Sequence, residues 1–517
     1  MLSKKYLIGA MILLFLVVGL FSSVRMAKAQ NVIKIGIFGP KYLGGAIQYP
    51  HWVAGMWSAA QMLAEQANAA GGWDVGGTKY LIEVYSADEY THDYTNTAGI
   101  EASIDYLCKP PSQGGVGVNF IVGGFRTECV QYAIQYWHSA GYSESVPFLI
   151  NGAATNELLS NTVGVNHDSW RHLYRIMPVN STALFATFTA SIKTYLCSDT
   201  GILTTLFGKG DAKLVKTAII MEDAAWTNTM WYALYQNKTL SAYYLGPHVQ
   251  VVDEACTRLP DGDTVPCPPQ DIAAALTNVK NYGCNLLIHV FSGSTGKALM
   301  VKYNDLQVPA LPVGINVVSQ TQAMWTGTGG KCEYESHLMS LGTRTPLTPQ
   351  MVKFWDDFLD WTGNYTGARR WPVYTAIGVG NAFITLKDAI ETLDTLNIEQ
   401  IHNYLCPRTN PGRTLQVLTG MSSFDNNHDV YQSHLDYSVY WTGNARAWVV
   451  QWLDGSLEVV YPRKYLNGSD IPFVKVWCLP QWMYTLIWDQ NYNGYVGGDD
   501  ITAVAKHFGA RWTPPDP

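Results

Sequence analysis

The chain has 517 residues, of which 47% are hydrophobic and 13% aromatic, and its 34 basic residues against 41 acidic ones give a formal charge of −7. Such an apolar composition excludes an intrinsically disordered chain, and the acidic balance argues against a nucleic-acid-binding protein. Allowing about 100 to 200 residues for each domain, the length predicts two or three domains, each large enough to bury its own core.

The N-terminal segment has the pattern of a secretory signal. Lys4 and Lys5 precede an unbroken apolar run over 6–21, and Ala27-Lys28-Ala29 then offers small residues at the positions that a signal peptidase reads. We therefore expect residues 1–29 to be a signal peptide that is cleaved after Ala29. A retained anchor is the alternative, although the run is shorter than the roughly 20 residues that span a bilayer. The protein is expected to be exported, to the periplasm, the medium or the cell surface.

All nine cysteines lie in the exported part, where disulfides are permitted. Cys256 and Cys267 enclose a turn-rich insert and form one candidate pair, and Cys108 with Cys129 forms another. The odd number leaves at least one thiol without a partner in the monomer. No two cysteines have zinc-ribbon spacing, and the 12 histidines are scattered without an HExxH motif, so the sequence disfavours a metalloenzyme.

After the signal, short apolar runs rich in β-branched residues alternate with helical stretches. The first strand is predicted at 32–38, and the first helix at 52–70, closed by Gly71-Gly72. Further strands are predicted at 80–85, 120–122, 147–150, 214–221, 286–291 and 311–314, and helices at about 129–140, 182–196, 226–240 and 271–282. This alternation predicts the α/β class, with parallel sheets flanked by helices. Ligands of such sheets lie beyond the carboxyl ends of the strands, so the residues after each strand are the candidates for a site.

Short motifs in a fixed order carry a family resemblance. They are VIKIGIFGP (32–40), QANAAGG (66–72), YLIEVYSAD (80–88), NFIVGGFRT (119–127), VPFLINGAAT (146–155), YRIMP (174–178), KTAIIMEDAAW (216–226), SFDNN (423–427) and VVQWLDGSLEVVYP (449–462). Together they resemble type I periplasmic binding proteins, in particular the branched-chain amino-acid-binding (Leu/Ile/Val-binding) branch of ABC-importer receptors. The resemblance extends over roughly residues 32–465.

The resemblance implies two lobes of similar topology, joined by three crossover strands at a hinge, with the ligand between them. Mapped onto this chain, the first lobe takes 31–175 plus 318–418, and the second takes 176–317 plus 419–475. A C-terminal extension takes 476–517. Because each half of the site belongs to a separate lobe, ligand binding shifts the population toward a closed state, which the importer's permease recognises.

In this family a Ser-Ser turn supplies hydroxyl and N–H groups to the ligand's carboxylate, and the matching residues here are Arg126 and Thr127. An arginine there grips an anion with two hydrogen bonds, or it pairs with nearby Glu128 at the surface; the sequence leaves both roles open. The resemblance also implies ligand contacts from a second loop and an aromatic wall, made of Ala153, Ala154, Thr155, Trp226 and Phe125. A buried structural role is the alternative for Trp226.

After the strand at 286–291, amino-acid-binding members of the family offer a carboxylate to the ligand's ammonium, but the loop at 292–297 contains no acid. A buried ammonium without a counter-charge is costly, so a free amino acid is disfavoured unless Glu222 or Asp223 takes that place. We therefore expect a small polar organic solute, such as an amide, an organic acid, a peptide or a sugar derivative, or an amino acid if Glu222 or Asp223 supplies the counter-charge. Further wall residues are expected at Tyr42, Ser292, Ser294, Asn316 and Tyr374.

The C-terminal extension contains a candidate calcium loop at 489–500. Oxygen side chains occupy loop positions 1, 3, 5 and 12, and Gly494 occupies position 6, which is EF-hand spacing. The expected Ca²⁺ ligands are Asp489, Asn491, Asn493, the carbonyl of Tyr495, and Asp500. The loop resembles one dockerin-type repeat, a module that normally has two copies and binds a surface partner. With only two charged ligands, we expect a dissociation constant of about 10⁻⁴ to 10⁻³ M. An Asn/Gly-rich loop without metal is the alternative.

The sequence therefore predicts an extracytoplasmic solute-binding protein of an ABC importer, with no catalytic residues. A cell-surface sensor on the same fold is the alternative. A secreted enzyme is disfavoured, since no GxSxG elbow occurs and the Gly296-Lys297 pair lacks the other residues of a phosphate-binding loop.

Overall fold

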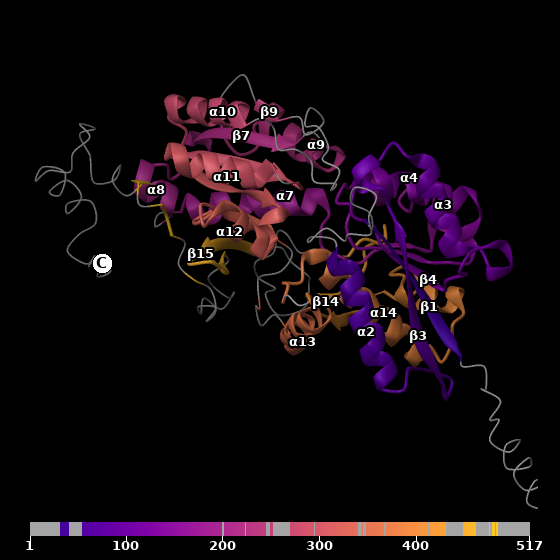
Figure 1. Cartoon of the computed structure of the whole chain (residues 1–517). Helices are drawn as coiled ribbons and strands as arrows, with labels where there is room; N and C mark the ends of the chain where they lie inside the picture. The colour runs from indigo at the N-terminus through magenta and orange to yellow at the C-terminus, as the bar shows by residue number, and fades with distance from the viewer. Residues whose placement is uncertain are drawn as a thin grey trace, which may run out of the picture.

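In a computed structural model of the chain, the described residues form two lobes, each built on a mainly parallel β-sheet (Figure 1). The described residues are 31–40, 54–198, 201–222, 224–244, 249–251, 269–293, 295–339, 344, 348–366, 369–411, 413–430, 448–461, 475, 478–480 and 482–483. The predicted α/β class is confirmed. Among these residues, none of the helices combines the length and the apolar character needed to cross a bilayer.

The first lobe contains a six-stranded sheet in the order β2-β3-β1-β4-β5-β6. Its strands are β1 (Val32–Gly39), β2 (Trp73–Val75), β3 (Thr78–Asp88), β4 (Phe120–Gly123), β5 (Phe148–Ile150) and β6 (Leu173–Arg175). Strand β1 runs parallel to both neighbours, with Ile35 opposite Val84 of β3 and Phe120 of β4. Apolar side chains of β1 are buried on both faces, which is typical of a parallel sheet covered by helices.

Helices cover both faces of this sheet. They are α2 (Ala54–Ala69), α3 (Thr97–Cys108), α4 (Thr127–Ser139), α5 (Glu157–Ser160), α6 (His167–Trp170), α13 (Pro349–Thr366), α14 (Tyr374–Leu393) and α15 (Ile398–Leu405). Helices α2 and α14 pack against each other on one face, and α3 packs against α4 on the other (Figure 1). The first lobe thus recruits α13 and α14 from late in the chain.

The second lobe contains an eight-stranded sheet in the order β16-β15-β12-β11-β10-β7-β8, with β9 also paired to β7. Its strands are β7 (Lys216–Glu222), β8 (Tyr243–Tyr244), β9 (Val249–Val251), β10 (Leu286–Phe291), β11 (Leu311–Asn316), β12 (Ser336–Met339), β15 (Trp448–Leu453) and β16 (Ser456–Tyr461). Its helices are α7 (Ser181–Ser191), α8 (Ile202–Phe207), α9 (Ala225–Trp231), α10 (Pro269–Tyr282), α11 (Thr295–Leu306) and α12 (Gln322–Thr328). A separate hairpin pairs β13 (Leu415–Val417) with β14 (Gly420–Ser422).

The structure differs from the expected division of the chain at residue 318. The sequence prediction assigns 318–418 to the first lobe, whereas β12 pairs with β11 and with β15 inside the second sheet. The four-residue strand Ser-His-Leu-Met carries no long apolar run, so its pattern does not reveal a strand. The first-lobe elements resume with α13 at Pro349, which packs on α2.

Two chain segments lie side by side where the chain leaves the first lobe after β6. The backbone N–H of Arg175 donates to the carbonyl of His428 at 2.9 Å, and the N–H of Val430 donates to the carbonyl of Arg175 at 3.1 Å. The fully buried guanidinium of Arg175 donates to Asp429 Oδ2 at 3.2 Å, and Asn180, which caps α7, donates to the same oxygen at 2.8 Å. A buried ion pair therefore fastens the start of the crossover.

The predicted pair Cys108 with Cys129 is wrong, because both thiols are free. Each side chain is buried in the apolar core between α3 and α4, where cysteine acts as a small hydrophobic residue. The part of the chain that the structure describes contains no disulfide. The other candidate pair, Cys256 with Cys267, lies outside the described residues.

Candidate functional site

The turn between β4 and α4 brings two backbone amides to the carboxyl edge of the first sheet. Gly123 and Gly124 have φ angles of 139° and 87°, and a Cβ on Gly123 would lie 2.0 Å from the carbonyl oxygen of Phe38. Only glycine fits this close approach. The turn directs the N–H of Phe125 to Glu89 Oε2 at 2.6 Å and the N–H of Arg126 to Glu89 Oε1 at 3.0 Å.

Glu89 follows β3 directly, and its side chain is fully buried. The hydroxyl of Thr91 also donates to it. Burial raises the pKa of Glu89 to about 7, although its hydrogen-bond donors oppose that rise. Of the two residues that the resemblance matches to the Ser-Ser turn, Arg126 therefore donates its N–H to a carboxyl group of the protein itself.

Arg126 takes part in a series of polar contacts that connects the two lobes. Its Nε donates to Glu128 Oε2 at 3.1 Å, and its guanidinium carbon lies 4.1 Å from the centre of the Tyr94 ring. The other carboxylate oxygen of Glu128 accepts the N–H of Ala225, at the start of α9 in the second lobe, at 3.0 Å. The pairing with Glu128, one of the two roles expected of Arg126, is thus present, and Glu128 bridges the lobes.

In the second lobe, Glu222 at the end of β7 gathers two of the predicted residues. Its Oε1 accepts the indole N–H of Trp226 at 2.6 Å, and its Oε2 accepts both the N–H and the hydroxyl of Ser292 at 2.9 Å. Burial lowers the pKa of Arg126, but the carboxylates of Glu128 and Glu222 raise it overall, so Glu222 acts electrostatically across the lobe boundary.

The second predicted loop packs against the first. The N–H of Ala153, which has a left-handed φ of 49°, donates to the carbonyl of Phe125 at 2.9 Å. The carbonyl of Ala154 accepts from the N–H of Ser181, and the hydroxyl of Thr155 donates to Glu157. The hydroxyl of Thr127 is buried with no hydrogen-bond partner among the described residues. This loop thus contacts the β4–α4 turn on one side and the crossover on the other.

The predicted residues thus fall into three groups. The first group contains the turn residues Phe125, Arg126 and Thr127, of which Phe125 contacts the second loop and the Tyr374 ring, whose centre lies 6.4 Å from that of Phe125. The second-lobe group holds Trp226 and Ser292, and Glu128 joins it to the first. Asn316 lies apart, in the core of the second lobe, where its amide donates to buried Glu335 at 2.7 Å. The residues outside the described part are Tyr42, Ser294, Asp489, Asn491, Asn493, Tyr495 and Asp500.

Sequence reasoning missed Glu89 and the bridging role of Glu128. The predicted strand at 80–85 was too short, since β3 continues to Asp88. The rule that ligand-binding residues follow strand ends would have included Glu89 if the strand had been given its full length. Nothing in the local pattern around Glu128 indicates a contact with α9, because 97 residues separate it from Ala225.

Comparison with known proteins gives structural neighbours only. No family model matches the chain, and no curated protein matches it in sequence. A structure of LivJ from Streptococcus pneumoniae, a branched-chain amino acid transporter substrate-binding protein in complex with isoleucine, has a TM-score of 0.58 and 15% identity, covering 84% of this chain and 100% of its own.

Two further neighbours have different descriptions. A putative branched-chain amino acid ABC transporter from Silicibacter pomeroyi has a TM-score of 0.60 and 13% identity, covering 88% of this chain and 100% of its own. An ABC-transporter solute-binding protein from R. palustris, in complex with benzoate, has a TM-score of 0.56 and 11% identity, covering 87% of this chain and 99% of its own. The chain shares the two-lobed fold of type I periplasmic binding proteins, as the sequence motifs predict.

Proposed function

We propose that the protein is an extracytoplasmic solute-binding protein of an ABC importer, which captures a small polar organic solute between its two lobes and passes it to a membrane permease. The observation that supports this most directly is the bridge from Glu128 on α4 to the N–H of Ala225 on α9. It brings the strand-end loops of both sheets to a common boundary, where ligands of α/β sheets bind. A shared fold alone does not give a function, so the proposal depends on this site.

The charges at this boundary favour a solute that carries amine or amide donors. Among the contacts described above, the Arg126 guanidinium pairs with Glu128 and feels the charge of Glu222, whereas Glu89 accepts the backbone N–H of Arg126, so carboxyl groups outnumber cations here. The backbone N–H groups of Phe125 and Arg126, in the β4–α4 turn, already donate hydrogen bonds to Glu89. A carboxylate solute would therefore have to displace an internal carboxyl group, whereas an ammonium or amide group finds acceptors.

Glu222 is the residue that we assign to the solute's donor group. Its present partners include the side chains of Trp226 and Ser292, which can rotate, and a carboxylate accepts about four hydrogen bonds. In the sequence, this is the position that could replace the acid missing from the 292–297 loop. The indole of Trp226 then lies beside the solute and gives an apolar or cation–π contact.

Binding would act through the equilibrium between open and closed lobes. A solute that touches Glu222 on one lobe and the Phe125–Tyr374 side of the other gains its full set of contacts only when the lobes meet. It therefore shifts the population toward the closed state in proportion to its differential affinity. We propose that a permease distinguishes this closed state, and that no covalent change of the solute occurs.

A thermal-shift screen with matched compounds tests the proposal. Each amino acid is compared with its amide, its decarboxylated amine and its deaminated acid, alongside short peptides, sugars and aromatic acids. We expect stabilisation by members that carry an amine or amide, by about 2.7 kcal/mol at a hundredfold excess over the dissociation constant.

Glu222→Gln should abolish the response, and Glu458→Gln, on the outer strand β16, should keep it. Recovery of the bound compound by mass spectrometry completes the test. A chemically altered compound, or no response across the panel, would contradict the proposed function.

A further inference from the structure

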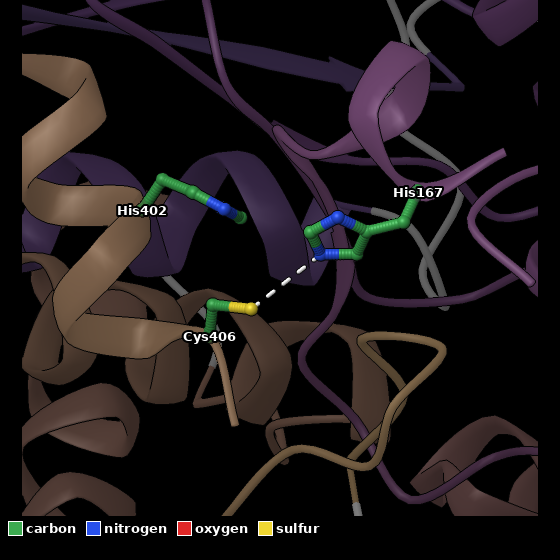
Figure 2. Close-up of side chains that lie close together, drawn as sticks. All are labelled: His167, His402 and Cys406. Carbon is green, nitrogen blue, oxygen red and sulfur yellow. Dashed lines mark hydrogen bonds between the residues drawn. The ribbon is translucent and has the colours of Figure 1, made fainter. Parts of the chain in front are cut away.

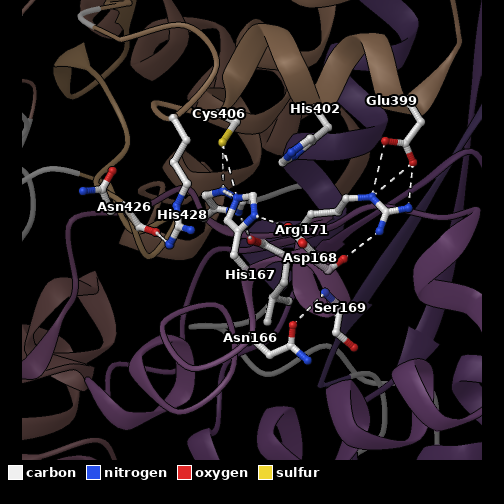
Figure 3. Close-up of polar contacts among 12 residues, drawn as sticks. Asn166, His167, Asp168, Ser169, Arg171, Glu399, His402, Cys406, Asn426 and His428 are labelled. Atoms are coloured by element: carbon white, nitrogen blue, oxygen red, sulfur yellow. Dashed lines mark hydrogen bonds and ion pairs between the residues drawn. The ribbon is translucent and has the colours of Figure 1, made fainter.

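A cluster of imidazole and thiol groups lies in the first lobe (Figures 2 and 3). His167 begins α6, His402 and Cys406 lie at the end of α15, and His428 belongs to the segment that pairs with Arg175. The ligand atoms of His167, His402 and Cys406 all lie within 4.8 Å of one another. These residues come from three separate parts of the chain, so no sequence spacing indicates the cluster.

Three of these side chains direct their donor atoms at one another. The Nε2 atoms of His167 and His428 are 3.2 Å apart. The sulfur of Cys406 lies 3.5 Å from the Nε2 of His167 and 3.4 Å from that of His428. A tetrahedral zinc ion, with Zn–N near 2.0 Å and Zn–S near 2.3 Å, separates its ligand atoms by about 3.3 Å (N to N) and about 3.5 Å (N to S). The three observed distances match that triangle.

The outer nitrogen of each ring fixes its tautomer. His428 Nδ1 lies 3.1 Å from the carbonyl oxygen of Leu173, and His167 Nδ1 lies 3.2 Å from a carboxylate oxygen of Asp168. Both oxygens only accept hydrogen bonds, so each Nδ1 carries the hydrogen and each Nε2 presents a lone pair. The single hydrogen of the Cys406 thiol cannot satisfy both Nε2 atoms and their mutual contact. A cation at the centre would satisfy all three atoms.

The surroundings of His428 and His402 favour the neutral form of these two rings. Burial, together with the neighbouring histidines, lowers the pKa of His428 to about 3 and that of His402 to about 4. The Tyr174 ring stacks on the His428 ring, with the two ring centres 4.4 Å apart, and the Tyr174 hydroxyl forms a hydrogen bond with His402 Nδ1 at 2.7 Å. Such outer contacts orient metal-binding histidines.

We propose that His167, His428 and Cys406 bind a divalent transition-metal ion of the zinc type, with His402 beside them as the candidate for the fourth position. A thiolate and two imidazoles suit zinc and disfavour calcium and magnesium, which take oxygen ligands. Binding releases the thiol proton of Cys406 to solvent. The ion would fasten α6 and the end of α15 to the segment at 428–430, next to the Arg175–Asp429 ion pair where the crossover begins.

Cobalt spectroscopy on the full, tag-free chain tests this site. The protein is treated with a chelator, dialysed and titrated with Co²⁺ under reducing conditions. We expect one equivalent to bind, with the intense visible bands of a four-coordinate ion and a near-ultraviolet thiolate-to-cobalt charge-transfer band. Excess Zn²⁺ should remove both signals. An absence of binding, or a spectrum of a six-coordinate ion with oxygen ligands only, would overturn the proposal.

Matched variants separate the cluster from adventitious binding. Cys406→Ser should lose the charge-transfer band, whereas Cys108→Ser, at another buried thiol of the same lobe, should retain it. Because Cys406 is fully buried and its variant could fail to fold, His167→Gln provides a second test at a half-buried ring. We expect His167→Gln to weaken Co²⁺ binding at least about tenfold, and His138→Gln on α4 to leave it unchanged. Unaltered binding in His167→Gln would refute the assignment.

Discussion

The two lobes each place a buried glutamate at the carboxyl edge of their sheet, but the two residues differ in their partners. Glu89 of the first lobe accepts the backbone N–H groups of Phe125 and Arg126. Glu222 of the second lobe accepts the indole of Trp226 and both donors of Ser292. The donors from the β4–α4 turn to Glu89 are backbone groups, which cannot leave without deforming the turn, whereas two of the donors to Glu222, the indole of Trp226 and the hydroxyl of Ser292, are side-chain groups that can rotate. This difference supports a structural role for Glu89 and the ligand-binding role proposed for Glu222.

The largest expected effect comes from removing the charge of the second-lobe glutamate. Glu222→Gln should weaken binding of an amine-bearing solute by about 2 to 5 kcal/mol, because a buried ammonium would lose its counter-charge. Isothermal titration calorimetry with the solute found in the thermal-shift screen measures the change. Glu458→Gln on β16 serves as the control and should bind as the wild type does. Equal affinity in Glu222→Gln would remove the distinction between the two glutamates.

The first-lobe glutamate should instead control the pH dependence of stability. Burial raises the pKa of Glu89 in the folded state to about 7, above the ordinary value of 4.5 for this side chain, so the folded state holds this proton more tightly than the unfolded state. Its stabilising contribution is complete below about pH 4.5 and is lost as the pH rises through about 7, by up to about 3 kcal/mol.

Glu89→Gln keeps a neutral side chain at every pH, so it should lack this part of the slope. Urea denaturation of the wild type and the variant between pH 4.5 and 8 measures the difference. We expect the wild type to lose stability relative to Glu89→Gln as the pH rises through this window. Parallel pH profiles would show that the Glu89 carboxyl is not perturbed by its burial.

Local patterns in the sequence predicted most of the fold, because its strands are continuous apolar runs. The predicted strand at 32–38 corresponds to β1 and that at 286–291 to β10, while β12, which carries Ser336 and His337, gave no such signal. Contacts between distant parts of the chain were beyond this reasoning. Glu128 meets Ala225 across 97 residues, and His167 meets His428 across 261, so only the folded chain shows that they are neighbours.

Removing the hydrogen bond between Glu128 and Ala225, which bridges the lobes, should have an effect of intermediate size on the lobe equilibrium. Glu128→Ala removes the acceptor for the N–H of Ala225, and a hydrogen bond to a charged group contributes about 1.5 to 3 kcal/mol. The loss should shift the unliganded protein toward the open state, which small-angle X-ray scattering detects as a larger radius of gyration. Gln131→Ala, on the exposed side of the same helix, should leave the scattering unchanged. If Glu128→Ala scatters as the wild type does, this bridge does not hold the lobes together.

The smallest expected effect concerns the calcium loop proposed at 489–500, which lies outside the described residues. With a dissociation constant of about 10⁻⁴ to 10⁻³ M, 1 mM free Ca²⁺ stabilises the folded loop by only about 0.4 to 1.4 kcal/mol. Asp489→Ala removes one of two charged ligands and should abolish the calorimetric signal of Ca²⁺ binding. Asp499→Ala, at a position without a ligand role in EF-hand spacing, should retain that signal. Solute affinity at the lobe boundary should be the same in both variants, because neither Glu89 nor Glu222 is altered. Identical Ca²⁺ titrations of Asp489→Ala and the wild type would reject the loop as a metal site.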